Sequence, residues 1–242
     1  MVAKIFIDGE AGTTGLEIRE RLLPRKDLAL LSIAADKRKD EGAKKDLLAQ
    51  ADLVILCLPD DAAKQTVALV DSLGADAPRV LDASTAHRIA PGWVYGFAEM
   101  AAGQAGAIHA ASKVANPGCY ATGAIALLRP LVDAGLILAA TPLTINAVSG
   151  YSGGGKSMIE AYEARQAPDF ELYALGLEHK HLPEIVTYSK LDRRPIFVPS
   201  VADFRQGMLV SIPLHLDDLP HRPKASDLQA VLKVHYAQST FV

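Results

Sequence analysis

Short apolar runs alternate with longer amphipathic segments from residue 2 to residue 81. We predict that the runs are strands, at residues 2–7, 28–33, 53–58 and 79–81. Between them, apolar side chains recur every three or four positions, which predicts helices over residues 13–23, 43–51 and 62–73. Asp60 or Asp61 can cap the third helix. Because the strands are apolar throughout, both faces of their sheet should be covered, as in a doubly wound α/β unit with parallel strands.

The regular alternation ends after Ser84. A helix is expected over residues 119–132, directly after Pro117-Gly118, and another over residues 157–164. Strands are expected at residues 143–148, 195–198 and 208–214, in a more antiparallel region. We therefore predict two domains, residues 1–116 and residues 117–242, of which the second is α+β.

Composition and charge narrow the functional classes. The chain has 242 residues, half of them hydrophobic, and a formal net charge of −3, so neither nucleic acid nor an anionic membrane is expected as a main partner. No apolar stretch reaches the roughly 18 residues of a membrane span, and residues 1–8 are too short for a signal-peptide core. The two cysteines make no disulfide framework, and no Cys/His spacing resembles a structural zinc site. We expect a cytoplasmic protein without a bound metal.

A glycine-rich turn follows the first predicted strand and opens the first predicted helix. Gly9, Gly12 and Gly15 stand in the run Gly-Glu-Ala-Gly-Thr-Thr-Gly, together with Thr13 and Thr14. Glycines allow a tight turn and let the backbone approach a pyrophosphate, which the helix N-terminus then binds. The spacing differs from the common G-x-G-x-x-G, and a simple strand-to-helix turn is the alternative. The position at the first strand favours a Rossmann-type dinucleotide site.

The segment after the second strand carries Asp36-Lys37-Arg38-Lys39. A dinucleotide site reveals its ribose preference about twenty residues beyond the glycine turn. Adjacent cations favour the 2′-phosphate of NADP, since a guanidinium can donate two hydrogen bonds to phosphate. Arg38 is the best candidate, whereas Lys37 and Lys39 also fit an ordinary charged surface loop.

The two cysteines stand in different surroundings. Cys57 lies inside an apolar strand and reads as a small buried hydrophobe. Cys119 follows Asn116-Pro117-Gly118 at the start of a helix, where the helix dipole and free amides stabilise a thiolate. The same amides can serve as an oxyanion hole. A structural cysteine is the alternative reading of Cys119.

A thiolate that does chemistry needs an acid/base partner. His179 and His181 stand in one short segment, flanked by Glu178 and Glu184 and followed by a proline. This crowding of charge beside a proline is unusual for a plain helix surface, which makes the two histidines the best candidates.

Several motifs together resemble the N-acetyl-γ-glutamyl-phosphate reductase family, and most closely its shorter, second type. Asn-Pro-Gly-Cys-Tyr-Ala-Thr at residues 116–122 is similar to the active-site motif of that family. The glycine turn and five further motifs stand in the same order, at residues 57–61, 82–88, 149–156, 179–184 and 206–208.

The resemblance implies a fold shared with aspartate-semialdehyde dehydrogenase and glyceraldehyde-3-phosphate dehydrogenase. It implies NADPH-dependent reductive dephosphorylation of N-acetyl-γ-glutamyl phosphate to N-acetyl-L-glutamate 5-semialdehyde, through a cysteine thioester, in arginine biosynthesis. Cys119 would then be the nucleophile, and either His179 or His181 the acid/base group. The resemblance also implies cofactor contacts from the glycine turn and from residues 84–88, including Ser84. The residues implied near the substrate are Ser149, Ser152, Gly153 and Lys156, with Glu184 orienting a histidine or binding substrate.

The chain departs from the family at its end. Members continue into a segment with a Leu-Asp-Asn-Leu-Gly-Lys-Gly-like motif, which forms a helix that packs back on the cofactor domain. This sequence stops at Phe241-Val242, so we expect that helix to be absent. A homodimer or homotetramer through the second domain is implied. The alternatives are a reductase of an aspartyl or aminoadipyl phosphate, a non-catalytic NADP-binding protein, and a Cys/His hydrolase.

Overall fold

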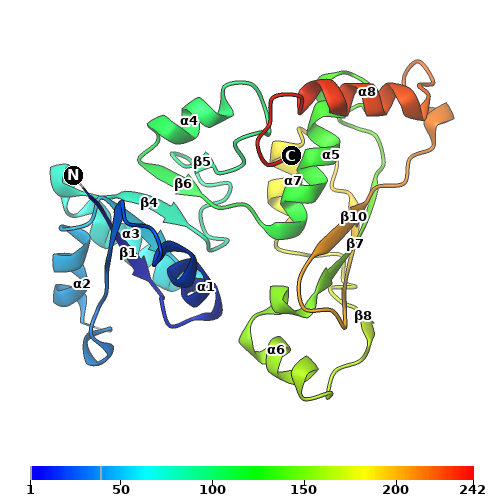
Figure 1. The fold of residues 1–242 in the computed structure, drawn as a ribbon. Coiled ribbons are helices and arrows are strands. Elements are labelled where there is room, and N and C mark those ends of the chain that lie inside the picture. The colour runs from blue at the N-terminus through cyan, green and yellow to red at the C-terminus, as the bar shows by residue number, and fades with distance from the viewer. Residues whose placement is uncertain (1, 39) are drawn as a thin grey trace. The chain divides into compact units, whose positions relative to one another are not determined.

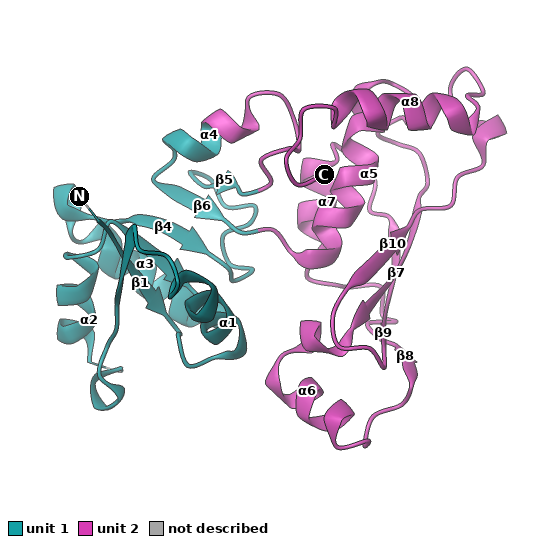
Figure 2. Ribbon diagram, in the orientation of Figure 1, with its two compact units in different colours: residues 1–96, 107–116 teal, residues 97–106, 117–242 magenta. Residues whose placement is uncertain are grey.

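The computed structural model describes residues 2–38 and 40–242, so Lys39 lies outside the described residues. The chain forms two compact units (Figure 2). The first comprises residues 1–96 and 107–116, and the second comprises residues 97–106 and 117–242. The segment 97–106 thus packs with the second unit, although it precedes residue 116 in the sequence.

The first unit is built on a six-stranded sheet with the order β2-β1-β3-β4-β6-β5. Every neighbouring pair is parallel, which confirms the predicted parallel sheet. Its strands are β1 (Ala3–Asp8), β2 (Leu28–Leu31), β3 (Leu53–Leu56), β4 (Arg79–Asp82), β5 (Val94–Tyr95) and β6 (Lys113–Ala115). The short strands β5 and β6 carry no apolar run, and the sequence did not predict them.

Helices cover both faces of this sheet, as the apolar strands predicted (Figure 1). The helices are α1 (Thr13–Leu22), α2 (Glu41–Leu48), α3 (Asp60–Asp71) and α4 (Gln104–Ala110), the last shared between the units. Phe6 and Val67 belong to the core under α2 and α3, and Ile7 packs with Ile18 of α1 on the other face. Full burial of such a side chain stabilises the fold by about 1.5–3 kcal/mol.

The predicted cap of α3 is wrong. Pro59 occupies the N-cap position, and Asp60 and Asp61 lie in the first helical turn. The Asp60 carboxylate instead accepts hydrogen bonds from the backbone N–H, at 2.9 Å, and the hydroxyl of Thr85. It therefore connects α3 to the turn after β4.

The connection order creates a switch point in the sheet. The chain passes from β1 to β2 on one side and then crosses to β3 on the other side of β1. At such a point the loops at the carboxyl ends of the two central strands diverge and leave a crevice, where open α/β sheets bind their ligands. The glycine turn of residues 9–15 follows β1 at this crevice.

The second unit contains a four-stranded sheet with the order β10-β7-β9-β8. Its strands are β7 (Thr144–Gly150), β8 (Phe170–Leu172), β9 (Ile196–Ala202) and β10 (Met208–Ser211). The expectation of a more antiparallel region holds for β10/β7 and β8/β9, but the central pair β7/β9 is parallel. A long crossover through α6, β8 and α7 returns the chain to the same end of the sheet, which parallel pairing requires.

Four helices accompany this sheet: α5 (Cys119–Asp133), α6 (Lys156–Glu163), α7 (Leu182–Tyr188) and α8 (Ala225–His235). Helix α5 buries Ala124, Ile125 and Leu128, and it packs against β10, α7 and α8. Gly123 permits close packing, since a Cβ there would lie 2.8 Å from a methyl group of Val210. None of the helices in the described part of the chain has the length and hydropathy that crossing a lipid bilayer requires.

Candidate active site

The glycine turn after β1 is a tight backbone structure. Gly9 has a φ of +93°, and a Cβ at this residue would lie 2.3 Å from the carbonyl oxygen of Cys57. A Cβ at Gly15 would lie 2.2 Å from the carbonyl oxygen of Gly9. Gly12 is the N-cap of α1, so the first-turn amides, including those of Thr13 and Thr14, remain available to an anionic ligand.

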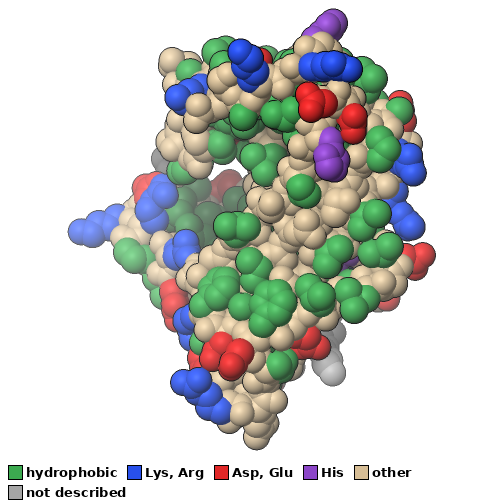
Figure 3. Space-filling view, turned by 90° about the vertical axis from the view of Figure 1, so that its right-hand side faces the viewer, with side chains coloured by type: hydrophobic (Ala, Val, Ile, Leu, Met, Phe, Trp, Pro, Cys, Tyr) green, Lys and Arg blue, Asp and Glu red, His purple; other side chains and the backbone are tan. Residues whose placement is uncertain are grey.

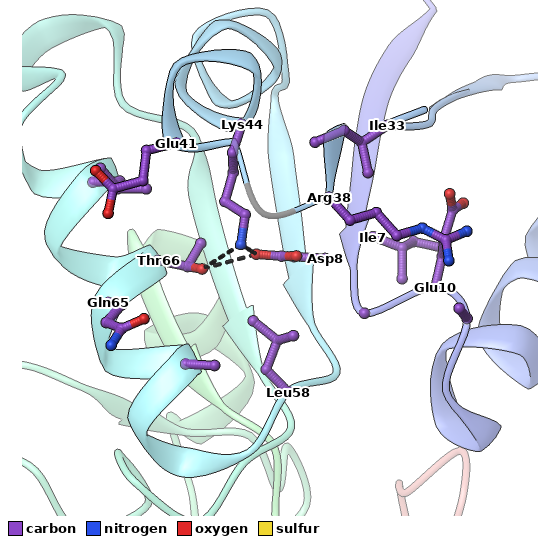
Figure 4. Close-up of a pocket in the computed structure, with 14 residues that line it drawn as sticks. Ile7, Asp8, Glu10, Ile33, Arg38, Glu41, Lys44, Leu58, Gln65 and Thr66 are labelled. Atoms are coloured by element: carbon purple, nitrogen blue, oxygen red, sulfur yellow. Dashed lines mark hydrogen bonds and ion pairs between the residues drawn. The ribbon is translucent and has the colours of Figure 1, made fainter. Parts of the chain in front are cut away.

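A cavity of about 380 Å³ opens beside this turn, entirely within the first unit (Figure 4). Apolar groups of Ile33, Leu58 and Leu69 share its lining with several charged side chains. A concave cavity of this size that combines apolar and polar groups suits a charged small molecule. Its position beside the switch point matches the place expected for a dinucleotide.

Arg38 lies at the exposed end of a 3-10 turn after β2 and lines this cavity. Figure 4 shows its guanidinium on the side of Glu10. Arg38 also shares a neighbouring shallow pocket with Arg19 and Ser32. The Arg19 guanidinium donates to Glu10 and to the Ser32 hydroxyl, each at 2.8 Å. Sequence reasoning missed Arg19, whose helical spacing looks like that of any exposed helix face.

Ser84 lies in a buried polar network at the end of β4. The fully buried Asp82 carboxylate accepts hydrogen bonds from the Ser84 amide at 2.9 Å and the Ser84 hydroxyl at 2.7 Å. It also lies 2.6 Å from Nδ1 of His87, whose ring stacks on Trp93. Ser84 is only 7% exposed and its hydroxyl bonds Asp82, so the side chain fixes the loop after β4, and its contact with a cofactor stays a prediction.

Cys119 is the first residue of α5, and its side chain is exposed. Gly118 is the N-cap of the helix, which leaves first-turn amides near the sulfur. By contrast, burial and nearby carboxylates raise the pKa of the half-buried Cys57 to about 11. Cys119 thus lies at a helix N-terminus as predicted, whereas Cys57 directly follows β3 and is half-buried, not buried inside a strand, although its raised pKa keeps it a thiol near neutral pH.

Glu184 is buried and contacts the backbone beside Cys119. It is 1% exposed, and its carboxylate accepts a hydrogen bond of 3.0 Å from the backbone N–H of Gly118. Its suggested role, to orient a histidine or to bind substrate, stays a prediction. From the protein interior, Glu184 contacts the backbone of the turn that carries Cys119.

The two histidines lie around Tyr120, the residue that follows Cys119. Their ring centroids lie 6.1 Å (His179) and 6.0 Å (His181) from that of Tyr120, and 4.6 Å from each other. The backbone N–H of His181 donates to Nδ1 of His179 at 3.1 Å, so the other ring nitrogen of a neutral His179 carries the proton. His181 is buried and His179 is half-buried.

Tyr173 completes this cluster and was missed in the sequence. Its ring lies 5.9 Å from that of His179. Burial, followed by a hydrogen bond with Tyr120 and the nearby charge of Cys119, raises the pKa of Tyr173. The residue follows a three-residue strand in an irregular segment, where no motif marks it.

The remaining substrate candidates lie around the glycine cluster after β7. Ser149 hydrogen-bonds the Tyr120 hydroxyl at 2.8 Å and so contacts the cysteine-histidine cluster. Ser152 and Gly153 lie in the 3-10 turn Tyr151–Gly154. Lys156 begins α6 at the surface, where its amine lies 3.7 Å from Glu160.

Comparisons with known proteins identify the family of the chain. Residues 4–108 match the family model of the semialdehyde dehydrogenase NAD binding domain, and residues 119–242 match that of the semialdehyde dehydrogenase dimerisation domain. The chain is 56% identical over 239 residues to N-acetyl-gamma-glutamyl-phosphate reductase of Chelativorans sp. (strain BNC1), covering 98% of this chain and 76% of that protein. The chain belongs to the N-acetyl-γ-glutamyl-phosphate reductase family. The reductase of Brucella ovis is 53% identical and is covered over 79% of its length.

Solved structures agree with this family at the level of the fold. Aspartate semialdehyde dehydrogenase II from Vibrio cholerae has a TM-score of 0.65 at 14% identity, covering 96% of this chain and 78% of that chain. The Candida albicans enzyme solved with NADP has a TM-score of 0.59 at 15% identity, covering 96% of this chain and 76% of that one. The predicted dehydrogenase-like fold of this reductase family member is thereby confirmed.

Proposed function

We propose that this chain reduces N-acetyl-γ-glutamyl phosphate to N-acetyl-L-glutamate 5-semialdehyde, with NADPH, in arginine biosynthesis. The observation that carries the proposal is the exposed sulfur of Cys119 at the N-terminus of α5, in one unit with the His179/His181 pair. Membership of the reductase family supports the choice of substrate.

The first unit, within residues 1–116, would hold the cofactor. Gly9 and Gly15 shape a tight turn in which a Cβ would collide with backbone atoms, and Gly12, Thr13 and Thr14 would present the start of α1 to a pyrophosphate. Arg38 would bind the 2′-phosphate. When bound, the cofactor supplies the hydride that reduces the acyl group.

The second unit, within its residues 117–242, would carry the acyl chemistry. The Cys119 thiolate attacks the acyl carbon, a C–S bond forms, the bond from carbon to the phosphate oxygen breaks, and inorganic phosphate leaves. The resulting thioester is reduced to a thiohemiacetal anion, whose oxygen the α5 amides can stabilise. His179 or His181 lends a proton to this oxygen and takes it back when the C–S bond breaks and the aldehyde forms. Such acid/base help is worth about 10²–10⁴ in rate.

Substrate recognition would involve the glycine cluster of the same unit. Ser149, Ser152, Gly153 and Lys156 offer hydroxyl, amide and ammonium donors that suit a phosphate group. Turnover with N-acetyl-γ-glutamyl phosphate should exceed turnover with aspartyl phosphate or an aminoadipyl analogue. Preferred turnover of either analogue would replace this substrate while leaving the reaction type in place.

The nucleophile is tested by trapping the acyl-enzyme. Wild type mixed with substrate in the absence of NADPH should gain the acyl mass in intact-mass spectra, and C119S should not gain it while still binding NADPH. A thioester-type adduct on C119S would contradict the assignment.

The cofactor preference is tested at Arg38. R38A should weaken NADPH binding by calorimetry about 10- to 100-fold, which corresponds to the loss of a charge-assisted contact of roughly 1.5–3 kcal/mol, and should leave NADH binding nearly unchanged. Equal losses for the two cofactors would remove the argument for 2′-phosphate recognition.

We also propose a homodimer or homotetramer in the cytoplasm. One face of the second sheet exposes Phe170, Leu172, Ile196 and Leu209, each 47–62% accessible, and Figure 3 shows hydrophobic side chains gathered on this side of the molecule. A contiguous apolar patch on a soluble protein marks an interaction surface. The match to a dimerisation domain supports a second copy of the chain as its partner. The net charge of −3 argues against nucleic acid or an anionic membrane.

A further inference from the structure

The cavity beside the glycine turn contains a buried ion pair that the proposed mechanism does not use. The Lys44 ammonium lies 2.8 Å from Oδ2 of Asp8, and the Thr66 hydroxyl donates to the same oxygen at 2.8 Å (Figure 4). The ammonium also lies 3.4 Å from the Thr66 oxygen. The side chains of Lys44 and Asp8 are only 17% and 8% exposed.

This cluster connects three elements that bound the cavity. Asp8 is the last residue of β1 and directly precedes the glycine turn, Lys44 belongs to α2, and Thr66 belongs to α3. All three line the cavity. A change in the cluster therefore acts on the wall of the ligand site itself.

We propose that Lys44 is a positioning and charge-compensating residue of the dinucleotide site, which neutralises Asp8 so that an anionic cofactor can bind beside it. The inference rests on the proposed NADPH binding and adds a residue to it. Asp8 holds the ammonium in place, and Thr66 supplies the second hydrogen bond to the carboxylate.

The charges around the cavity explain why compensation is needed. The lining holds three carboxylates, from Asp8, Glu10 and Glu41, and two cations, from Arg38 and Lys44. Removal of the Lys44 charge changes the formal sum from −1 to −2 and leaves a buried carboxylate one residue before the pyrophosphate-binding turn. At an effective dielectric constant near 20, one uncompensated negative charge about 6–12 Å from a bound anion weakens binding of that anion about 10- to 100-fold.

Fold stability alone does not call for this pair. A buried ion pair is often no better for stability than apolar side chains of similar volume, because both charges lose their hydration. The pair lies in the cavity beside the proposed pyrophosphate-binding turn, so its role would be in cofactor binding. If this view is correct, removing both charges together should restore cofactor affinity that removal of one charge destroys.

The experiment compares K44M, D8N and the K44M/D8N double variant in the full chain. Dissociation constants for NADPH and for 2′,5′-ADP, which probes the adenosine half alone, are measured by calorimetry, with urea unfolding of each variant as the fold control. K113M is the matched control, since Lys113 of the same unit pairs with Asp71 at 2.6 Å but does not line the cavity.

K44M should weaken NADPH binding about 10- to 100-fold, and the double variant should bind within a few-fold of wild type. K113M should bind as wild type does. Normal NADPH affinity of K44M, or a double variant as weak as K44M, would overturn the inference while leaving the proposed function intact. Failure of wild type to bind NADPH would overturn both.

Discussion

Replacement of Gly15 by alanine tests whether the glycine turn is shaped by contact between backbone atoms. The added Cβ would lie 2.2 Å from the Gly9 carbonyl oxygen and 2.7 Å from Cα of Glu10. Optimal contacts between such atoms are nearer about 3.5 Å, so the overlap exceeds roughly 1 Å. Both neighbours are backbone atoms, and relief requires the turn itself to move.

The magnitude follows from two opposing terms. Forcing an extra carbon into a packed site costs about 1–3 kcal/mol, and the severity of this overlap points to the upper end. Alanine gains about 1 kcal/mol over glycine in a helix. We expect G15A to lower the free energy of unfolding of the first unit by about 2 kcal/mol, and to weaken NADPH at least about tenfold because the amides of the turn shift.

Urea unfolding followed by the fluorescence of Trp93 measures this effect, since the chain has one tryptophan and it belongs to the first unit. G12A is the matched control in the same turn. Its Cβ would lie 3.4 Å from the Gly9 oxygen, an ordinary contact, and the φ of Gly12 is −80°. G12A should shift the unfolding free energy by less than about 1 kcal/mol. Equal urea midpoints for G15A and G12A would refute the steric argument.

Three further outcomes follow from the second unit and from the buried thiol. In C119S, iodoacetamide should modify Cys57 very slowly at pH 8 and faster as the pH rises toward 11. Burial and nearby carboxylates raise the pKa of Cys57 to about 11, so the reactive thiolate forms only well above neutral pH. Rapid labelling of Cys57 at pH 8 would contradict this prediction. E184A should lose about 1–3 kcal/mol of stability in urea unfolding, because the buried N–H of Gly118 loses its acceptor, while E184Q should lose less; equal losses in both variants argue against the hydrogen bond. L209D, which places a charge where Leu209 is 62% exposed, should convert the proposed oligomer to monomers in light scattering, and an unchanged mass would exclude this face from the interface.

The pattern of apolar residues predicts the first unit well because its strands are buried on both faces. Strands β2 and β3 are continuous apolar runs, and the interior residues of β1 and β4 are apolar apart from Lys4, which leaves few alternatives to a covered parallel sheet. The pattern fails where an element is short. Strand β5 has two residues and β6 has three, so neither contains a periodicity that a window could detect.

The parallel pairing of β7 and β9 could not be read from the sequence for another reason. Register and direction depend on the path of the chain between the strands, here through α6, β8 and α7. Strand β8 has three exposed residues and α7 only seven, with a proline in its first turn. Neither element gives a strong local signal. The pattern of apolar residues therefore does not reveal the crossover that makes β7 and β9 parallel.

The candidate site divides in the same way between local and distant determinants. Gly9 and Cys119 stand in turns whose adjacent residues indicate a ligand site, and the sequence predicted both as site candidates. Asp8 and Lys44 meet across 36 positions of sequence, and no local feature distinguishes Lys44 from the neighbouring Lys45 on α2. The burial of Glu184 and its hydrogen bond from Gly118, 66 positions away, likewise have no local signal in the sequence, and its role near a histidine or the substrate stays a prediction.

The N-termini of helices α1 and α5 share one electrostatic requirement, since each would stabilise an anion in the proposed reaction. Helices α1 and α5 each follow a strand of the parallel sheet, begin at a glycine, and present amides that favour an anion. Each also has a buried carboxylate close by: Asp8 before α1, and Glu184 behind α5. An uncompensated carboxylate at either place would oppose the pyrophosphate or the thiolate that the helix favours. The chain satisfies Asp8 with an ammonium and a hydroxyl, and Glu184 with the N–H of Gly118, which is a neutral donor. The charges of Asp8 and Lys44 can therefore be removed together in K44M/D8N, whereas no side-chain deletion removes the backbone N–H of Gly118 that E184A deprives of this acceptor.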